Sequence, residues 1–313
     1  VHQAQIPLAT ISGWVYHDRS DDGIFNQGPE EGIGGVTLEL LDANGNGTGI
    51  TTTASTDPSK LGFYEFRNLV PGTYGVREVQ PSGWLDGKDT AGDHGGSAAA
   101  EPASTIIDKI TGASLNYGDH GLNYNFGELL PSSISGRVHA DNGPDCDFDN
   151  PDNHWLAGVP IDLLDAQGNV LATTHTDQEG NYKFDGLRPG TYGVREHQPP
   201  EYFDGGERVG SEGGASSDIG TQYSVFTGIY LGSDIDAVHY DFCEKPPSSI
   251  AGRDHADPGA DCDFDDPNNH WLAGVTIDLL DKDGNVIATT KTDTGGAYKF
   301  TGLARGQYTV REH

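Results

Sequence analysis

The sequence has few positive charges for its length. Its 313 residues carry 18 Lys and Arg against 48 Asp and Glu, which gives a formal net charge of −30. A surface of this kind repels nucleic acid and anionic membranes, whereas it suits divalent cations. Apolar runs are also short, and none approaches the ~18 residues of a membrane span. We therefore expect no nucleic-acid partner and no membrane-spanning segment.

Methionine is absent, and cysteine occurs only three times. Without Met or a signal-like segment at Val1, we interpret the sequence as a mature or trimmed piece. Three cysteines are too few for a disulfide scaffold, and no amphipathic helix of useful length is found. What is abundant is glycine, at 45 residues, between short alternating runs of Thr, Val, Ile, Tyr and Phe. This pattern predicts many short strands joined by turns.

One unit of sequence occurs three times. It opens with "ISGWVYHD" at Ile11, "ISGRVHAD" at Ile134 and "IAGRDHAD" at Ile250. Each copy continues with alternating apolar residues into an Asx/Gly turn, as in "GVTLELLDANGN", and then with a second hairpin that is rich in aromatic residues. Spacings of 123 and 116 residues are typical of whole domains rather than of a solenoid. We predict an all-β chain of roughly seven-stranded β-sandwiches, arranged as beads on a rod.

The repeats give the predicted domain boundaries. We expect residues 1–10 to be an N-terminal segment or linker, and the three repeats to cover residues 11–129, 130–245 and 246–313. The third copy stops at His313, which aligns with His197, so we expect it to be truncated before its closing strand. We expect the residues that follow in the same protein to complete it. The alternative is a strand donated by another subunit, such as Val1 to Ile6.

Three motifs carry a resemblance to a known family. They are a DxSxDG loop at Asp18, "EGIGGV" from Glu31 to Val36, and "YEFRNLVPGTYGVRE" followed by "NYNFGE". The sequence resembles the Cna-B / SdrD B-like repeats of bacterial cell-surface adhesins, a family of prealbumin-like β-sandwiches. The resemblance implies extracellular stalks, often stiffened by calcium, and no catalysis. Some relatives join a Lys of the first strand to Asn by an isopeptide bond. The first strands here contain no Lys, so we do not expect that bond.

An acidic loop follows the first strand of repeat 1, and its spacing matches an EF-hand-like calcium loop. Asp18, Ser20, Asp22 and Asn26 stand at loop positions 1, 3, 5 and 9, Ile24 would offer its carbonyl at position 7, and Glu30 supplies the late acid one place beyond position 12. We therefore predict Ca²⁺ at this loop.

The corresponding loops of repeats 2 and 3 have a changed ligand set. Cysteine replaces the turn glycine, and asparagine replaces the late glutamate, while further carboxylates appear. The predicted calcium ligands are Asp141, Asp145, Asp147, Asp149 and Asn153 in repeat 2, and Asp257, Asp261, Asp263, Asp265 and Asn269 in repeat 3. Close like charges repel by ~1 kcal/mol per pair even in water, so such a loop is hard to order without a cation. The alternatives are a solvated loop without a ligand, and zinc at His139, Cys146 and His154.

The cysteines suggest a cross-link. When repeat 2 is aligned on repeat 1, Gly23 becomes Cys146 and Gly127 becomes Cys243. If the domains stack end to end, the first strand and the closing strand both finish at the far pole. We therefore predict a Cys146–Cys243 disulfide that closes 97 residues. A Cys243–Cys262 pair and three free thiols remain as alternatives.

We predict a structural role for the chain. No catalytic triad or phosphate loop recurs with motif spacing, so we do not expect an enzyme. Only a stalk uses the features that all three copies share. We expect an extracellular stalk or filament module of a bacterial surface protein, stiffened by calcium, with further repeats or head-to-tail copies as its partners. The alternative is an adhesin module that binds a host, matrix or carbohydrate ligand through its long loops.

Overall fold

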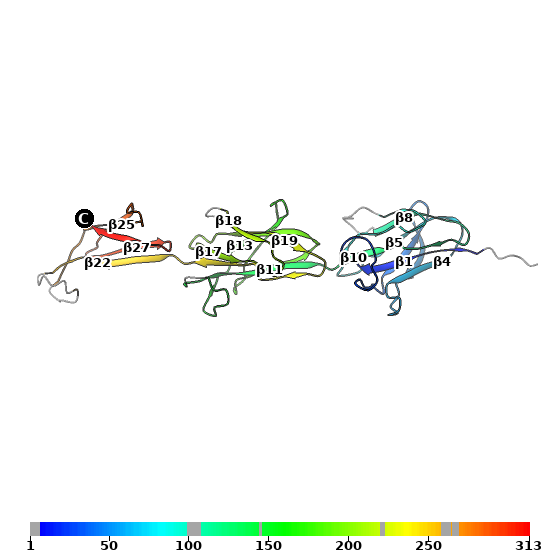
Figure 1. The fold of residues 1–313 in the computed structure, drawn as a ribbon, viewed down its shortest axis with the longest axis horizontal. Helices are drawn as coiled ribbons and strands as arrows, with labels where there is room; N and C mark the ends of the chain where they lie inside the picture. Colours follow the sequence, from blue (N-terminus) through cyan, green and yellow to red (C-terminus); the bar gives the residue numbers. More distant parts are fainter. Residues whose placement is uncertain (1–6, 99–107, 144–145, 220–222, 258–263, 265–268) are drawn as a thin grey trace, which may run out of the picture.

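The structure is a computed structural model that describes residues 7–98, 108–143, 146–219, 223–257, 264 and 269–313. All the secondary-structure elements assigned in this part of the chain are β-strands. The strands form three groups, one for each repeat, which lie in a row along the long axis of the molecule (Figure 1). The predicted all-β fold of tandem domains is thus confirmed. Val1 to Ile6 lie outside the described residues.

Repeat 1 is a sandwich of two five-stranded sheets. One sheet has the order β3 (Gly47–Thr53), β2 (Thr37–Leu41), β5 (Gly72–Glu78), β8 (Asp108–Leu115), β7 (Ser97–Ala98). The other has the order β4 (Phe63–Leu69), β1 (Ala9–His17), β10 (Phe126–Leu129), β6 (Leu85–Asp86), and β9 (His120–Gly121) also pairs with β1. The strands longer than two residues number seven in the described part of this repeat.

Repeat 2 has the same two layers with longer outer strands. Its first sheet runs β14 (Val170–His175), β13 (Pro160–Asp165), β16 (Gly190–His197), β19 (Tyr223–Leu231), β18 (Ala215–Ile219). Its second runs β12 (His154–Trp155), β11 (Ser132–Ala140), β21 (Asp241–Lys245), β17 (Phe203–Arg208), and β15 (Asn181–Leu187) and β20 (Asp236–Ala237) also pair with β11.

Repeat 3 contains three smaller sheets. They are β22 (Ser248–Arg253) with β27 (Ala297–Leu303), β23 (His255–Ala256) with β24 (His270–Trp271), and β26 (Val286–Lys291) with β25 (Thr276–Leu280) and β28 (Thr309–Glu312). Among the described strands β22 pairs with β27 alone, whereas its counterpart β11 also pairs with the closing strand β21. Accordingly, the buried apolar cluster of described residues in repeat 3 has three members, against sixteen in each of the other repeats.

The first strand of each complete sandwich lies parallel to its closing strand. In repeat 1, Val15 is in register with Phe126, and in repeat 2, Val138 is in register with Phe242. The two strands of a parallel pair end at the same pole. The loop that follows the first strand therefore starts beside the point where the chain leaves the domain.

A close approach of the backbone before the closing strand explains the glycine in "SGW" and "SGR". A Cβ atom on Gly13 would lie 1.8 Å from the carbonyl oxygen of Tyr124, and the same holds for Gly136 and Tyr240. Each of these carbonyls accepts a hydrogen bond from a buried tyrosine, Tyr64 at 2.6 Å and Tyr182 at 2.5 Å. Only glycine leaves room for this contact beside the first strand.

Candidate metal-binding loops and the disulfide

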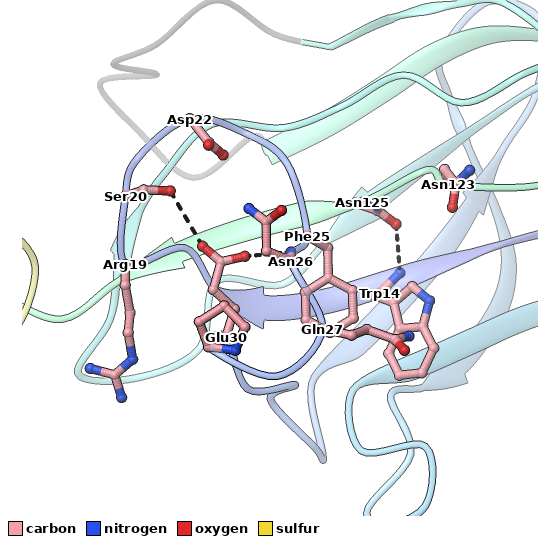
Figure 2. A pocket seen from close by; sticks show the side chains of 11 residues that line it. Trp14, Arg19, Ser20, Asp22, Phe25, Asn26, Gln27, Glu30, Asn123 and Asn125 are labelled. Atoms are coloured by element: carbon pink, nitrogen blue, oxygen red, sulfur yellow. Dashed lines mark hydrogen bonds between the residues drawn. The ribbon is translucent and has the colours of Figure 1, made fainter.

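The acidic loop of repeat 1 is anchored at the end of β1. The backbone N–H of Asp18 donates to the carbonyl of Glu128 on β10 at 2.9 Å, and the Asp18 side chain is fully buried. Carboxylate oxygens of Asp18, Asp22 and Glu30 lie within 4.8 Å of one another. Figure 2 shows Ser20, Asp22, Asn26 and Glu30 around the same curl of the chain. The loop thus brings the predicted acidic ligands together.

The hydrogen bonds inside this loop orient its carboxylates. Asp18 accepts from the N–H of Gly23 at 2.7 Å and from that of Asp22 at 3.2 Å. Glu30 accepts from the N–H of Asn26 at 2.7 Å and from the Ser20 hydroxyl at 3.4 Å. Gly23 has φ of 77°, where residues with a Cβ are strained. The chain can therefore turn sharply enough for residues 18 and 30 to face one point.

The remaining predicted ligands of this loop are Ile24 and Asn26. The Asn26 amide donates to the Ile24 carbonyl at 3.0 Å, so these two oxygen-bearing groups are adjacent. Burial raises the pKa of Glu30, although the hydrogen bond from Asn26 N–H opposes the rise. A bound cation would favour its charged form. Oxygen donors of this kind fit calcium better than transition metals.

An aromatic cluster supports the loop on its other side. The Phe25 ring lies 4.8 Å from Tyr16 and 5.1 Å from Trp14, measured between ring centroids. A cavity of about 840 Å³ opens beside it and is lined by Trp14, Ser20, Phe25 and Glu30, among others (Figure 2). The aromatic side chains fix the position of the loop against β1.

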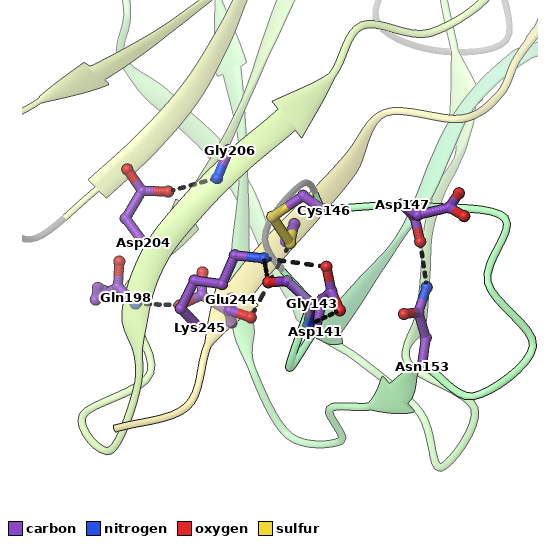
Figure 3. Close-up of a disulfide and its surroundings, with 11 residues drawn as sticks. Asp141, Gly143, Cys146, Asp147, Asn153, Gln198, Asp204, Gly206, Glu244 and Lys245 are labelled. Atoms are coloured by element: carbon purple, nitrogen blue, oxygen red, sulfur yellow. Dashed lines mark hydrogen bonds and ion pairs between the residues drawn. A yellow bond between two sulfur atoms is a disulfide. The ribbon is translucent and has the colours of Figure 1, made fainter. Parts of the chain in front are cut away.

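The loop of repeat 2 differs, because a lysine lies at its centre. Lys245 Nζ donates to Asp141 at 3.0 Å and to the Gly143 carbonyl at 2.9 Å, as Figure 3 shows. Burial opposes ionisation of Asp141, but the hydrogen bond from Gly143 and the Lys245 ammonium hold its pKa below the usual value. Lys245 aligns with Leu129 of repeat 1. Repeat 2 therefore has a built-in cation beside its first acid, which the sequence analysis missed.

The other described acids of this loop lie apart from Asp141. Asp149 forms an ion pair with Arg208 at 3.0 Å, and the Asn153 amide donates to the Asp147 carbonyl at 2.8 Å. Among the described residues, neither Asp147 nor Asp149 joins Asp141 in a group of three acids close enough to share an ion. Asp145 lies outside the described residues. Calcium in this loop stays a prediction that this arrangement does not favour.

The structure contains the disulfide that the sequence predicted. Cys146 and Cys243 are bonded, with Cα atoms 6.0 Å apart and 97 residues between them (Figure 3). Cys243 lies on β21 in register with His139 of β11, at the pole where the loop begins. Because the Cys146 sulfur is bonded to carbon and sulfur, it is not a thiolate, and the zinc alternative with His139 and His154 is wrong for this form.

Little of the loop of repeat 3 is described. Asp257 is half-buried, and Asn269 directly precedes β24. Asp261, Asp263 and Asp265 lie outside the described residues, as does Cys262. Phe264 packs on His255 with ring centroids 4.3 Å apart, as Phe148 packs on His139 in repeat 2 at 4.9 Å. The third loop thus repeats an aromatic contact of the second, and its calcium site stays a prediction.

The loop of repeat 1 lies at the boundary with repeat 2. His17 Nε2 is 2.8 Å from the Ser233 hydroxyl oxygen, which also accepts a hydrogen bond from the Leu130 N–H at 2.8 Å. Arg19 is 4.0 Å from Asp234. The residues that flank Asp18 on both sides therefore contact the next domain.

The fold and this loop define a class of protein, namely tandem β-sandwich domains with an acidic loop after the first strand. The chain belongs to the family of SdrD B-like domains, whose sequence profile matches residues 9–127, 132–243 and 256–313. This membership confirms the family resemblance, the location outside the cell or at its surface, and the expectation that the chain is not an enzyme.

Curated relatives match nearly the whole chain. Serine-aspartate repeat-containing protein F of Staphylococcus epidermidis is 28% identical over 98% of this chain and 17% of its own length. Serine-aspartate repeat-containing protein D of Staphylococcus aureus strain Newman is 31% identical over 96% of this chain and 22% of its own length. The chain thus spans about a fifth of each of these relatives.

The solved structures that match this chain include two Bacillus proteins. The Bacillus anthracis TIE protein is 18% identical to this chain, with a TM-score of 0.39. The match covers 98% of this chain and 45% of the TIE protein chain. BcpA, the major pilin subunit of Bacillus cereus, is 12% identical to this chain, with a TM-score of 0.37. The match covers 97% of this chain and 87% of the BcpA chain. Within the described residues, no helix is long and apolar enough to cross a membrane.

Proposed function

We propose that the chain is a stalk module of a bacterial surface protein and that calcium in the loop of repeat 1 stiffens its connection to repeat 2. The observation that carries this proposal is the position of the loop. Asp18 is its first ligand, and the neighbouring residues His17 and Arg19 contact Ser233 and Asp234 of the next domain. An ion that orders the loop would also order these contacts.

The charges of the loop explain why an ion would have a large effect. Asp18, Asp22 and Glu30 crowd three carboxylates together. Asp21, which precedes Asp22 in the chain, has its own charge met by Lys88 at 3.7 Å. Without a cation the three carboxylates repel one another, which favours an open loop. With Ca²⁺ bound, the repulsion becomes attraction, and the junction is held in one geometry.

Calcium is expected to raise the melting temperature of the full chain. A ligand at 100 times its dissociation constant stabilises the native state by about 2.7 kcal/mol. Asp22→Asn should reduce the calcium-dependent rise, whereas Glu65→Gln, which removes a carboxylate on the same repeat far from the loop sequence, should preserve it. Differential scanning calorimetry with calcium and with chelator measures both. Equal melting temperatures in the two conditions would contradict a calcium site.

Small-angle X-ray scattering on the same samples tests the stiffening itself. We expect a longer maximum dimension with calcium than with chelator for the unmodified chain and for Glu65→Gln. For Asp22→Asn the two values should coincide. A rise in melting temperature without any change in dimension would mean that calcium stabilises the domain but does not stiffen the stalk.

A further inference from the structure

A second group of acids lies inside repeat 1, between its two sheets. Glu78 at the end of β5 is in register with Asp108 of β8, and Glu128 lies on β10 of the opposite sheet. Oxygen atoms of these three side chains lie within 4.8 Å of one another. All three residues are at least 96% buried, with exposed fractions of 1%, 4% and 0%. The group therefore bridges the two layers away from solvent.

This buried group has few hydrogen-bond donors other than its own carboxyls. Glu78 and Glu128 share a carboxyl hydrogen bond, as do Asp108 and Asp89. Apart from these, both oxygens of Glu78, both of Asp108 and one of Glu128 receive no hydrogen bond from a described donor. The other Glu128 oxygen accepts from the Gln80 amide. No Lys or Arg of the described residues forms an ion pair with these three acids. Buried polar groups left in this state are costly, so the group needs a partner.

Two further acids extend the group. Asp86 and Asp89 lie next to Asp108, again with oxygen atoms within 4.8 Å. Five acids thus meet in one place, and a divalent cation among them would turn the repulsion between ionised carboxylates into attraction.

Repeat 2 offers a natural comparison at the same register positions. Glu196 and Glu244 replace Glu78 and Glu128, but Ser224 stands opposite Glu196 where Asp108 stands opposite Glu78. The described residues of repeat 2 contain no group of three such acids at this place. Ser224 is nevertheless buried in a fully formed sandwich. A serine at this position is therefore compatible with the sandwich fold, and Asp108 is specific to the acid group of repeat 1.

We propose that Glu78, Asp108 and Glu128 bind a second divalent cation inside repeat 1, with Asp86 and Asp89 as neighbouring acids. Oxygen atoms that approach within 4.8 Å of one another can surround an ion at the 2.3–2.6 Å typical of calcium. Calcium accepts irregular carboxylate geometry, whereas magnesium usually keeps several waters, for which an interior site offers little room. The site goes beyond the loop of the proposed function and would fasten one sheet to the other.

The number of calcium ions per chain tests this proposal. Native mass spectrometry of the full chain with Ca²⁺ alone, at neutral pH, gives that number directly. Asp108→Ser, which copies repeat 2, should lower it by one. Asp22→Asn in the loop should lower it by one independently, and the double variant by two. Glu65→Gln should leave it unchanged, since its carboxylate pairs with Arg67 and belongs to neither acid group of the repeat.

The outcomes separate this site from the loop. If Asp22→Asn lowers the number but Asp108→Ser does not, the interior site is overturned while the loop stands. If only Asp108→Ser lowers the number of bound ions, the interior site is supported and the calcium site in the loop is overturned. Asp108→Asn, of the same shape, replaces the serine variant if circular dichroism shows that the latter is unfolded. An anomalous difference peak between Glu78, Asp108 and Glu128 in Mn²⁺-soaked crystals of the unmodified chain would support the site, and no peak there would overturn it.

Discussion

Replacing Cys146 and Cys243 together with glycine is expected to lower the free energy of unfolding of repeat 2 by about 3–5 kcal/mol. The disulfide closes 97 residues, and opening it restores that freedom to the unfolded chain. Glycine is the matched replacement because Gly23 and Gly127 occupy these positions in repeat 1. Cys146 also has φ of 50°, which glycine adopts without strain. The folded domain should therefore persist, and the loss should come mainly from the missing cross-link.

Hydrogen exchange measured by mass spectrometry assigns the effect to a domain. Amides of β11 in repeat 2 should exchange faster in the double variant, whereas amides of β1 in repeat 1 should be unchanged. Reduction of the unmodified chain should have the same effect as the double substitution. Unchanged protection of β11 after both treatments would contradict a stabilising role for the disulfide. Peptide mapping without reductant checks the pairing itself.

Glu196→Gln is expected to stabilise repeat 2 by a few kcal/mol at pH 8 and to have little effect near pH 4. Glu196 and Glu244 are both buried, and their carboxyl groups form a hydrogen bond to each other, which requires a proton. Burial raises the pKa of Glu244 to about 8 and raises that of Glu196 as well. A glutamine at 196 donates an N–H to Glu244 at any pH, so no proton has to be retained.

The direction of this pH dependence follows from the linkage between proton binding and folding. Because the folded-state pKa values lie above the ordinary value of Glu, the stabilisation is fully present below about pH 4.5 and is lost as the pH rises towards 8. Each unit of pKa difference corresponds to about 1.4 kcal/mol. Urea unfolding between pH 4 and pH 9, with chelator present, should give falling stability for the unmodified repeat and a flatter profile for Glu196→Gln. The control is Glu179→Gln, an exposed acid of the same repeat. If the stability of Glu196→Gln fell with pH as steeply as that of Glu179→Gln, Glu196 and Glu244 would not share a proton.

The contrast between the two repeats gives these predictions a common basis. Gln80 donates to Glu128 in repeat 1, and Gln198 donates to Glu244 in repeat 2. The same pair of buried glutamates is therefore present twice, and the residue opposite the first of them, Asp108 or Ser224, distinguishes a proposed cation site from a proton-sharing pair. Figure 3 shows Gln198 and Glu244 of repeat 2 near the disulfide.

The sequence by itself determined the all-β class, the three repeats and the loop of repeat 1. Strand alternation, Asx/Gly turns and the spacing of Asp18, Asp22 and Glu30 are local patterns, and local patterns are visible without a structure. The disulfide could also be predicted from the sequence, because two glycines of repeat 1 are both replaced by cysteine in repeat 2. End-to-end stacking of the domains predicts both cysteines at one pole, where the parallel pair β11 and β21 brings them.

Only the tertiary structure decided what surrounds the acids. Lys245 follows Asp141 by 104 residues in the sequence, and it reaches Asp141 because β21 runs beside β11. Glu78 ends β5, Asp108 begins β8, and Glu128 is the third residue of β10. They meet only because two sheets pack face to face. Acids on strands usually point to solvent, so their sequence gives no sign of burial. Whether a carboxylate faces water, a lysine or other carboxylates depends on strand register and on the packing of the layers, and both of these are set by contacts between distant parts of the chain.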